Sequence, residues 1–484
     1  MNNQQLLHAI LRTDFKSFVR KVFTEVSAGD DYLDNWHIDV ICHEILDMIE
    51  GKNSRLIVNV PPRYMKSIIC SIALPAFLMG HDPTAKIICV SYNDQLAEKL
   101  ANDCRNVMSA QWYQDLFPRT RIHKSRRSLS DFETTRGGGR MSMSIGGTLT
   151  GRGADWIVID DPLKPADAMS DTQREKVNDW YGSTLCSRLN DKNTGKIMVI
   201  MQRLHENDLT GFLLNSNAGY KLVRLPVIAE EGERWEITDR LRREQKVFVR
   251  KKDELLHSAR ECGDIICEMR RAQGEFVFAG QYQQRPSPLS GGLVKTEWLC
   301  YYNDFPQKFT RIIQAWDTAE KTGVSNAYSA CVTLGVTSAN DNIYVLDVYR
   351  ERLNFPDLMK KIQEKYVWAD KTFEGAIVDL LIEDASSGTQ VLQQLKGVSW
   401  RNGNFVTVPA ESDKISRFGA SSVFIENGRV LFPAVAGNWW KDFVAEITRF
   451  PSTQFKDQCD AFAHAVNYAS KKSGTRGQAR AIIF

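Results

Sequence analysis

Four short runs of nearly unbroken hydrophobic residues constrain the fold of this sequence more than any other feature. They cover residues 55–60, 86–92, 156–160 and 196–201. Strands that are buried on both faces have this composition, and such strands occur in parallel sheets covered by helices on each side. Residues 93–110 have helical spacing, and Asn93 or Asp94 is placed to cap that helix. The pattern predicts an α/β domain with a mainly parallel sheet.

The second half of the sequence has a different order of elements. Predicted strands lie at 311–317, 329–336, 343–349, 375–383 and 405–410, with a helix-like segment at 357–369. Three consecutive strands, then alternating helices and strands, then closing helices, are typical of an RNase H-like domain. We therefore predict an α/β protein whose second domain is RNase H-like.

Length and composition indicate where the domains divide. A chain of 484 residues exceeds the size at which one hydrophobic core stops growing. Residues 285–308 begin with a stretch rich in Pro, Ser and Gly, and we expect a linker there. The expected domains are 1–284 and 309–470, followed by a basic, flexible tail at 471–484.

Charge is distributed unevenly along the chain. The formal net charge is only +3, so contacts with nucleic acid must come from local patches. Residues 228–273 are dense in charged side chains, and we expect solvated helices there at the edge of the first domain. A basic face for nucleic acid is the alternative for that segment.

Cysteine usage and apolar run lengths predict the compartment. The ten cysteines form no Cys-x-x-Cys pair, and several stand in apolar runs. We interpret them as core residues in a reducing cytosol, with metal ligation as the alternative. The N-terminus lacks the features of a signal peptide, and no apolar stretch is long enough to span a bilayer. A cytoplasmic protein without membrane contact is expected.

Residues 58–67, VNVPPRYMKS, have the pattern of a phosphate-binding loop after a strand. Such a loop offers backbone N–H groups, a Lys for the β- and γ-phosphates and a hydroxyl for Mg²⁺. Lys66 and Ser67 supply these side chains, but Val60 and Met65 replace the two glycines of the usual pattern. The expected nucleotide contacts are Pro62, Arg63, Tyr64, Met65, Lys66 and Ser67.

Another hydrophobic strand ends in two acids, Asp160 and Asp161. In an ATP-hydrolysing site, Asp160 would complete the Mg²⁺ shell, and Asp161 would orient or deprotonate the attacking water. The alternative is that both residues only begin a turn into Pro162. Finding the loop and the acids in the right order on predicted strands favours a nucleotide site.

Three further polar residues are candidates near this site. Arg63 in the loop can stabilise charge on the transferred phosphoryl group, and Arg152 could do so at a neighbouring subunit's nucleotide. For Arg152 an ordinary surface charge is the alternative. Gln202 follows a predicted strand and could sense the γ-phosphate, or it could only end the strand.

Acids in the second domain form a candidate metal centre at strand ends and on one face of a helix. They are Asp317, Glu383, Asp384, Asp457 and Asp460. RNase H-like nucleases hold two metal ions with carboxylates, so that one activates water and the other stabilises the leaving oxygen. Lys414 and Arg417 could contact phosphate or only solvate a loop.

Segments of the first half resemble the ATPase half of the large terminase subunit of tailed bacteriophages, the motor that pumps DNA into procapsids. They are NWHIDVICHEI, LIVNVPPRYMKS, LTGRGADWIVIDDPLK and MQRLHENDLTG. In that family the loop is often Pro-Pro-Arg-x-Gly-Lys-Ser, so Met65 is a departure. The resemblance places Trp36 and His37 in the adenine-recognition segment, where many relatives have Gln. Asp161 stands where relatives commonly have Glu.

Segments of the second half are similar to the nuclease half of the same family. They include IEDASSGTQVLQQL, DKISRFGASSVFIENGRVLFP and DQCDAFAHAVNY. The resemblance implies Asp317, Glu383 and Asp457 as metal ligands and places Asp460 behind them, although Asp460 stays a candidate ligand. Many relatives have His-Asp-Asp at 455–457, where this chain has Phe-Lys-Asp.

The resemblance implies an ATPase that uses ATP with Mg²⁺ and an endodeoxyribonuclease that uses two Mg²⁺ or Mn²⁺ ions. The implied partners are double-stranded viral DNA, the portal protein, the small terminase subunit and further copies in a ring, a pentamer on the portal. The implied location is the host bacterial cytoplasm, with transient docking on the procapsid portal. A DNA repair helicase or resolvase-type nuclease is one alternative. An inactive prophage-derived relic that binds DNA, suggested by Met65, is the other.

Overall fold

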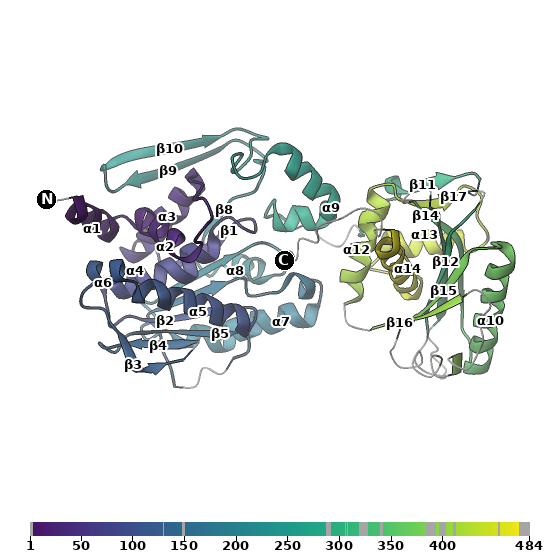
Figure 1. The fold of residues 1–484 in the computed structure, drawn as a ribbon, viewed down its shortest axis with the longest axis horizontal. Helices are drawn as coiled ribbons and strands as arrows, with labels where there is room; N and C mark the ends of the chain where they lie inside the picture. The colour runs from purple at the N-terminus through teal and green to yellow at the C-terminus, as the bar shows by residue number, and fades with distance from the viewer. Residues whose placement is uncertain are drawn as a thin grey trace. The chain divides into compact units, whose positions relative to one another are not determined.

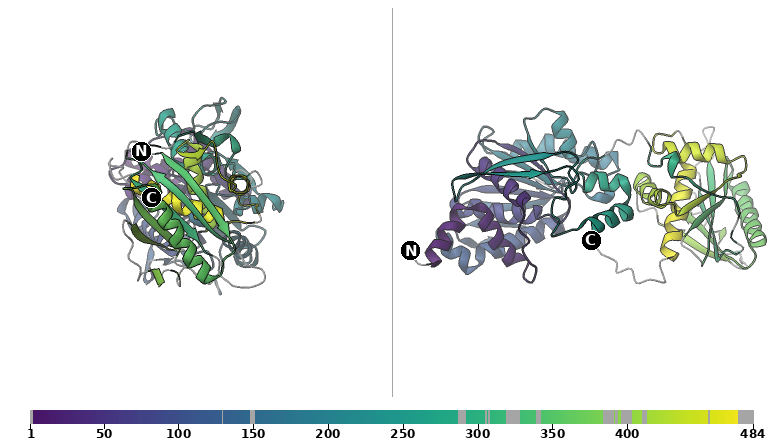
Figure 2. Two further views of the ribbon diagram at one scale, coloured as in Figure 1. Left: turned by 90° about the vertical axis from the view of Figure 1, so that its right-hand side faces the viewer. Right: turned by 90° about the horizontal axis from the view of Figure 1, so that it is seen from above.

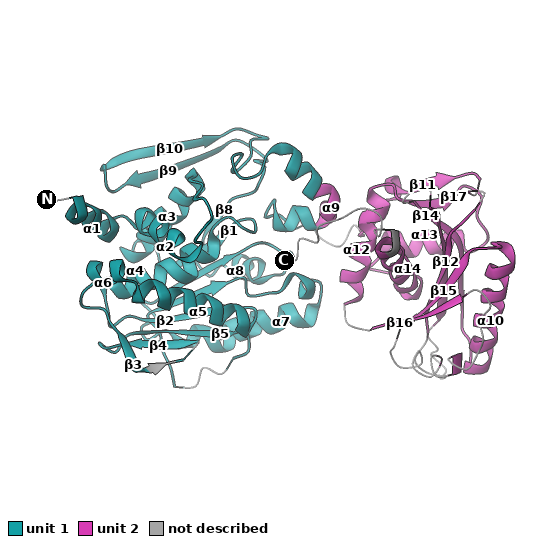
Figure 3. Ribbon diagram, in the orientation of Figure 1, with its two compact units in different colours: residues 1–269, 277–287 teal, residues 270–276, 288–484 magenta. Residues whose placement is uncertain are grey.

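The computed structural model describes most of the chain. The described residues are 3–128, 130–147, 151–286, 292–304, 306, 308–318, 328–338, 342–383, 391, 394–395, 403–409, 413–453 and 455–473. They form two compact units, residues 1–269 with 277–287 and residues 270–276 with 288–484 (Figure 3). Asp384 and residues 474–484 of the expected tail lie outside the described residues.

An eight-stranded sheet in the order β3-β4-β5-β2-β6-β7-β1-β8 is the frame of the first unit (Figure 1). Its strands are β1 (Arg55–Asn59), β2 (Lys86–Ser91), β3 (Ile122–Arg127), β4 (Asp131–Thr134), β5 (Gly139–Ser144), β6 (Trp156–Asp160), β7 (Lys196–Met201) and β8 (Lys221–Arg224). The strands from β5 to β8 in this order are parallel, and β3 and β4 add an antiparallel edge. The predicted mainly parallel sheet is confirmed.

Helices cover both faces of this sheet. Successive residues of a strand point to opposite faces, so neighbouring residues of β1 pack against different helices. Leu56 and Val58 of β1 pack with the helices of one face, and Ile57 packs with those of the other. The first face carries α1 (Asn3–Thr13), α2 (Phe15–Val26), α3 (Trp36–Ile49), α4 (Leu74–His81), α5 (Asp94–Ser109), α6 (Gln111–Leu116) and the helical segment η1 (Ile68–Ala73). The second carries α7 (Asp171–Trp180), α8 (Leu209–Asn215) and the short segments η2 (Pro165–Asp167), η3 (Tyr181–Leu185) and η4 (Cys186–Arg188).

The expectation of solvated helices throughout 228–273 is wrong. β9 (Glu233–Asp239) and β10 (Glu244–Arg250) form an antiparallel hairpin, and α9 (Gly263–Gln281) follows it. Side chains of a strand point alternately to its two faces, and Trp235 of β9 and Phe248 of β10 share the face that contacts Trp36. The high charge density of the segment hid the hairpin.

The second unit contains a seven-stranded sheet in the order β11-β17-β14-β13-β12-β15-β16. Its strands are β11 (Cys300–Tyr302), β12 (Arg311–Asp317), β13 (Ser329–Val336), β14 (Ile343–Glu351), β15 (Ile377–Glu383), β16 (Gly403–Val408) and β17 (Val430–Pro433). β12, β13 and β14 form an antiparallel meander, while β15 and β16 run parallel to β12. The predicted RNase H-like fold is confirmed.

Helices also cover both faces of the second sheet (Figures 1 and 2). They are α10 (Phe355–Thr372), α12 (Lys414–Glu426), α13 (Trp440–Arg449), α14 (Asp457–Ser473) and the short segment η6 (Thr296–Trp298). Trp316 faces α10, whereas Ile313 and Ala315 face α12, α13 and α14. β11 lies within the stretch expected as linker and pairs with β17. Across the described residues, no helix has the length and apolar character needed to cross a membrane.

Candidate functional sites

The nucleotide-site residues predicted from the sequence meet at one edge of the first sheet. β7 lies between β6 and β1, and because the three strands are parallel, their carboxyl ends share that edge. Asp160 ends β6 and Gln202 follows β7. The turn at 60–65, which includes Pro62, leads from β1 into a helix that begins at Lys66.

Lys66 forms an ion pair with Asp161, in which Nζ lies 2.5 Å from Oδ2. The side chain of Lys66 is 8% exposed and that of Asp161 is 17% exposed. Breaking so buried a pair would leave one charge without a partner, which is strongly unfavourable. The pair therefore fixes the loop lysine against the acid that follows β6.

Asp160 is buried beside this pair. Its Oδ2 accepts a hydrogen bond from Ser71 Oγ at 2.8 Å, and the Ser67 hydroxyl also bonds to the carboxylate. Burial, followed by the charge of Asp161, raises the pKa of Asp160 to about 6. Its Oδ1 is buried without a hydrogen-bond partner among the described residues. An unpaired carboxylate oxygen beside a serine hydroxyl fits a Mg²⁺ ion.

The backbone conformation at Met65 explains why the usual loop pattern has glycine at this position. Met65 has φ +69° and Arg63 has φ +68°, both in the left-handed region that glycine favours. A non-glycine residue there costs about 1 kcal/mol. The side chain of Met65 is partly buried against the core of the unit, and Arg63 is exposed. Met65 thus adopts a glycine-like backbone conformation while its side chain packs with the core.

Tyr64 and His37 contact each other beside the loop. Their ring centroids lie 5.5 Å apart, and Tyr64 Oη donates to Glu261 Oε2 at 2.8 Å. Burial lowers the pKa of His37 to about 3, so the ring is neutral at pH 7. Trp36 packs instead on the β9–β10 hairpin, with the Arg250 guanidinium 5.6 Å from its ring centroid. Of the two residues in the proposed adenine segment, His37 contacts the loop and Trp36 contacts the hairpin.

Gln202 reaches Asp161 through its main chain. Its backbone N–H donates to Asp161 Oδ1 at 3.1 Å, and its side chain is buried.

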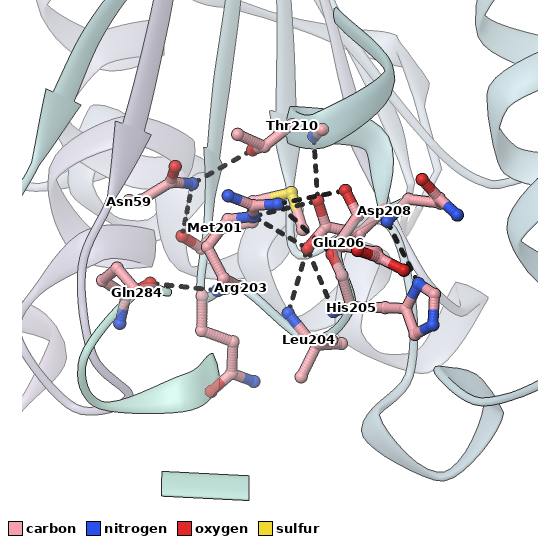
Figure 4. Close-up of polar contacts among 12 residues, drawn as sticks. Asn59, Met201, Arg203, Leu204, His205, Glu206, Asp208, Thr210 and Gln284 are labelled. Carbon is pink, nitrogen blue, oxygen red and sulfur yellow. Dashed lines mark hydrogen bonds and ion pairs between the residues drawn. The ribbon is translucent and has the colours of Figure 1, made fainter. Parts of the chain in front are cut away.

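The loop that follows Gln202 is organised by Asp208, a residue that sequence reasoning missed (Figure 4). Asp208 accepts hydrogen bonds from Arg203 Nε at 3.0 Å and from three backbone N–H groups. Its place just before α8, where it caps the helix, was the available signal.

Arg152 does not join this group within the described chain. Its Nη1 lies 2.6 Å from Asp131 Oδ2 on β4, and its side chain is 58% exposed. In the sheet, β5 and β2 separate β4 from β6. The structure therefore places Arg152 away from the Lys66 edge of its own subunit, so action on a neighbouring subunit's nucleotide stays a prediction.

The candidate acids of the second unit also converge. β12 and β15 are parallel neighbours, so Asp317 and Glu383 end at the same edge, while Asp457 and Asp460 lie in the first turn of α14. Burial raises the pKa of Asp317 to about 8; Lys414 opposes this shift, and the other three acids add to it. The four carboxyl groups are thus near enough to influence one another's ionisation.

Basic side chains balance these acids. Lys414 Nζ lies 2.5 Å from Asp460 Oδ2, and Arg417 Nη2 lies 3.2 Å from Glu383 Oε1. His464 Nε2 lies 3.5 Å from the same Glu383 oxygen, and its hydrogen bond holds the pKa of Glu383 below the ordinary value. Sequence reasoning missed His464, although it stands one helical turn after Asp460 on the same face of α14.

The acid cluster can be tested for its fit to a metal ion. Within the described part of the chain, no group of three or more His, Cys, Asp or Glu side chains is arranged to hold one. Asp317 Oδ2 and Asp460 Oδ1 are nevertheless buried without a hydrogen-bond partner among the described residues. Carboxylate oxygens are the ligands that divalent cations such as Mg²⁺ prefer. The free oxygens suit a cation, and Asp317, Glu383, Asp457 and Asp460 stay predicted ligands.

Comparison with known families identifies the second unit. Residues 314–469 match the family model described as the terminase RNaseH-like domain. The predicted resemblance to terminases is thereby confirmed, and the chain carries a domain of that family. No curated protein sequence matches the chain.

Solved structures with a similar fold include large terminases. The large terminase of a thermophilic bacteriophage is 11% identical, covering 93% of this chain and 98% of that chain with a TM-score of 0.49. The HK97 bacteriophage large terminase is 12% identical, covering 89% and 90% of the two chains with a TM-score of 0.36. The P22 large terminase nuclease domain is 17% identical, covering 38% and 93% with a TM-score of 0.27.

Proposed function

Because residues 314–469 form a terminase RNaseH-like domain, we propose that this chain is the large subunit of a phage terminase. In this proposal the first unit hydrolyses ATP to move double-stranded viral DNA into procapsids, and the second unit cuts concatemeric DNA. The observation that carries the ATPase half is the meeting of Lys66 and Ser67 with Asp160 and Asp161 at one sheet edge.

In the proposed ATPase site, each residue has a task that its contacts suit. Lys66 would exchange its ion pair with Asp161 for the β- and γ-phosphates. Asp161 would then be free to accept a proton from the attacking water, while the Gln202 N–H keeps its carboxylate oriented. Ser67 and Asp160 would hold Mg²⁺, which neutralises phosphate charge when bound. Arg63 is exposed in the loop and would face the transferred phosphoryl group.

In the proposed nuclease site, Asp317, Glu383, Asp457 and Asp460 would hold two Mg²⁺ or Mn²⁺ ions. When bound, such ions activate water and stabilise the leaving oxygen. Arg417 and His464 keep Glu383 ionised and oriented.

The proposed partners follow from the same assignment. A translocating motor cannot require one DNA sequence, so its contacts should be mostly to phosphates and strongly salt-dependent. We propose assembly into a ring on the portal protein, together with a small terminase subunit, in the cytoplasm of the host bacterium.

Two reciprocal variants of the full-length protein test both activities. Asp161→Ala should abolish DNA-stimulated ATP hydrolysis and leave Mn²⁺-dependent plasmid cleavage in place, because the two acids lie in different units. Asp317→Ala should do the reverse. A wild-type protein without either activity would instead support the prophage relic. Unwinding of a duplex by the wild type would support the helicase alternative.

A further inference from the structure

The loop after β7 carries two successive backbone N–H groups with different partners. The N–H of Gln202 donates to Asp161 Oδ1 at 3.1 Å. The N–H of Arg203 donates to Gln284 Oε1 at 2.9 Å (Figure 4). One stretch of main chain therefore touches the acid of the nucleotide site on one side and the segment after α9 on the other.

Gln284 is firmly placed to accept this hydrogen bond. Its residue surface is 1% exposed, and its Nε2 donates to the Gln281 carbonyl at 2.5 Å. Its backbone has φ +55°, and its own N–H donates to the Gly280 carbonyl at 2.9 Å. A buried side chain on a left-handed backbone is strained unless its surroundings hold it, and such positions concentrate at functional sites.

Asp208 ties the loop after β7 together. Asp208 binds the Arg203 guanidinium and three backbone N–H groups of the loop and the start of α8. A shift of the Arg203 main chain would therefore carry the neighbouring Gln202 N–H with it. Gln284 thus contributes to setting where that N–H stands relative to Asp161.

We propose that Gln284 is a positioning residue for ATP hydrolysis, acting through the main chain of Gln202 and Arg203 on Asp161. The inference rests on the proposed function and extends it. Because the first unit ends at residue 287, changes at Asp161 during the ATP cycle would also reach the segment that leads out of this unit. Gln284 itself does not need to touch the nucleotide.

The adjacent Gln283 provides a matched control. Its Oε1 accepts from the Ile228 N–H at 2.9 Å, and its Nε2 donates to the Ile228 carbonyl at 3.1 Å. Gln283 thus anchors the same segment by the same kind of hydrogen bond, but to the chain after β8 rather than to the loop after β7. A purely structural role would make the two glutamines equivalent.

The test compares Gln284→Met with Gln283→Met in the full-length protein, by steady-state ATPase kinetics with DNA. Methionine keeps the length of the side chain and removes the amide. We expect Gln284→Met to lower kcat about tenfold and to leave KM within about twofold, because the nucleotide contacts themselves are intact. Both variants should lower the Tm by a similar amount, because each loses a hydrogen bond of the same segment. Gln283→Met should nevertheless keep the kcat of the wild type.

Hydrogen exchange gives a second readout that does not depend on turnover. The Arg203 amide should exchange faster in Gln284→Met than in the wild type, and Gln283→Met should leave it unchanged. An ATP analogue should alter exchange of the amides at 282–285 in the wild type and lose that effect in Gln284→Met.

Equal losses of kcat in both variants, or an unchanged kcat in Gln284→Met, would overturn the inference. A wild type without ATPase activity would sink the proposed function instead. The exchange of the Arg203 amide separates these cases, because it reports the Gln284 contact in an inactive protein too.

Discussion

Two lysine–aspartate pairs with the same separation stand in very different surroundings. Lys66 lies 2.5 Å from Asp161 in the first unit, and Lys414 lies 2.5 Å from Asp460 in the second. The side chain of Lys66 is 8% exposed, whereas that of Lys414 is 53% exposed. Distance alone would make the pairs look equivalent.

This difference in exposure means that Lys66 is a fixed part of its site, whereas Lys414 is a cation that another cation can replace. Lys66 follows a loop fixed by the ends of parallel strands, and it leaves its acid only for another buried anion such as a phosphate. Lys414 opens α12 and has a half-exposed side chain that can turn into water, whereas its partner Asp460 is only 2% exposed and stays buried. The proposed nucleotide site is thus largely prepared in advance, whereas the acid cluster of the second unit keeps a cation that, in the proposed nuclease site, an incoming metal would displace.

The largest expected effect is the loss of the buried lysine. Lys66→Ala should lower DNA-stimulated ATP hydrolysis by about 10³-fold, a usual consequence of removing one preorganised charge from a phosphoryl-transfer site. Phosphate release measures it. Lys99→Ala is the control, because Lys99 pairs with Asp103 at 3.0 Å on the solvent-facing side of α5, where its side chain is 70% exposed. Retention of most of the activity in Lys66→Ala would remove the distinction between the two pairs.

The next effect is a pH dependence that differs between the two sites. Burial raises the pKa of Asp317 from 3.8, its ordinary value, to about 8 in the folded protein. Between those values only the folded state keeps the proton, so the free energy of unfolding falls as pH rises, by at most about 1.4 kcal/mol per pH unit. Urea unfolding of metal-free protein should show this decline, and Asp317→Asn should flatten it.

Asp160 supplies the comparison for that experiment. Its folded pKa is raised only to about 6, so Asp160→Asn should flatten the stability profile below that pH and leave the decline above it. Identical profiles for Asp317→Asn and Asp160→Asn would show that the two buried acids do not differ as described.

A smaller effect is expected from the exchangeable cation. Lys414→Met should tighten Mn²⁺ binding about tenfold, because one positive charge that competes for the acids is removed. Isothermal titration calorimetry measures the affinity without turnover. Lys361→Met is the matched control, since Lys361 pairs with Glu364 at 2.7 Å on α10. Unchanged or weaker Mn²⁺ binding in Lys414→Met would mean that Lys414 does not compete with the metal.

The smallest effect concerns the loop backbone. Met65→Gly should keep ATPase activity within about threefold of the wild type or raise it, because glycine adopts φ +69° without strain. Met65→Ala retains the strained Cβ and loses the packing, so it should be the less stable of the two in thermal unfolding. A fall of more than about tenfold in Met65→Gly would show that the packed side chain itself shapes the site.

The sequence predicted what depends on local pattern. Hydrophobic runs located β1, β2, β6 and β7 to within one or two residues, and Asn93 caps α5 as expected, accepting from the Leu96 N–H at 2.9 Å. The predicted ends of these strands were enough to place Lys66 and Asp161 at the same site. These features arise from periodicity and capping, which a short window of sequence contains.

The individual side-chain partners of residues that lie far apart in the chain could not be predicted from the sequence. Nothing near Arg417 on α12 indicates that it binds Glu383 at the end of β15. Nothing near Gln284 indicates that it binds Arg203. The β9–β10 hairpin was missed because its charged residues outnumber the few apolar ones that meet Trp36. Partners like these are chosen by the topology of the sheet, so a linear pattern does not contain them.

The pairing of β11 with β17 determines at which residue an expressed fragment of the second unit should begin. Tyr302 of β11 is 9% exposed and its Oη donates to the Val345 carbonyl at 2.7 Å, and the Leu293 N–H donates to the Phe450 carbonyl at 3.1 Å. A fragment that begins at residue 309 would lack this strand and leave the edge of β17 bare. Bare edges recruit other chains, so such a fragment would aggregate where one that starts before residue 292 stays dispersed.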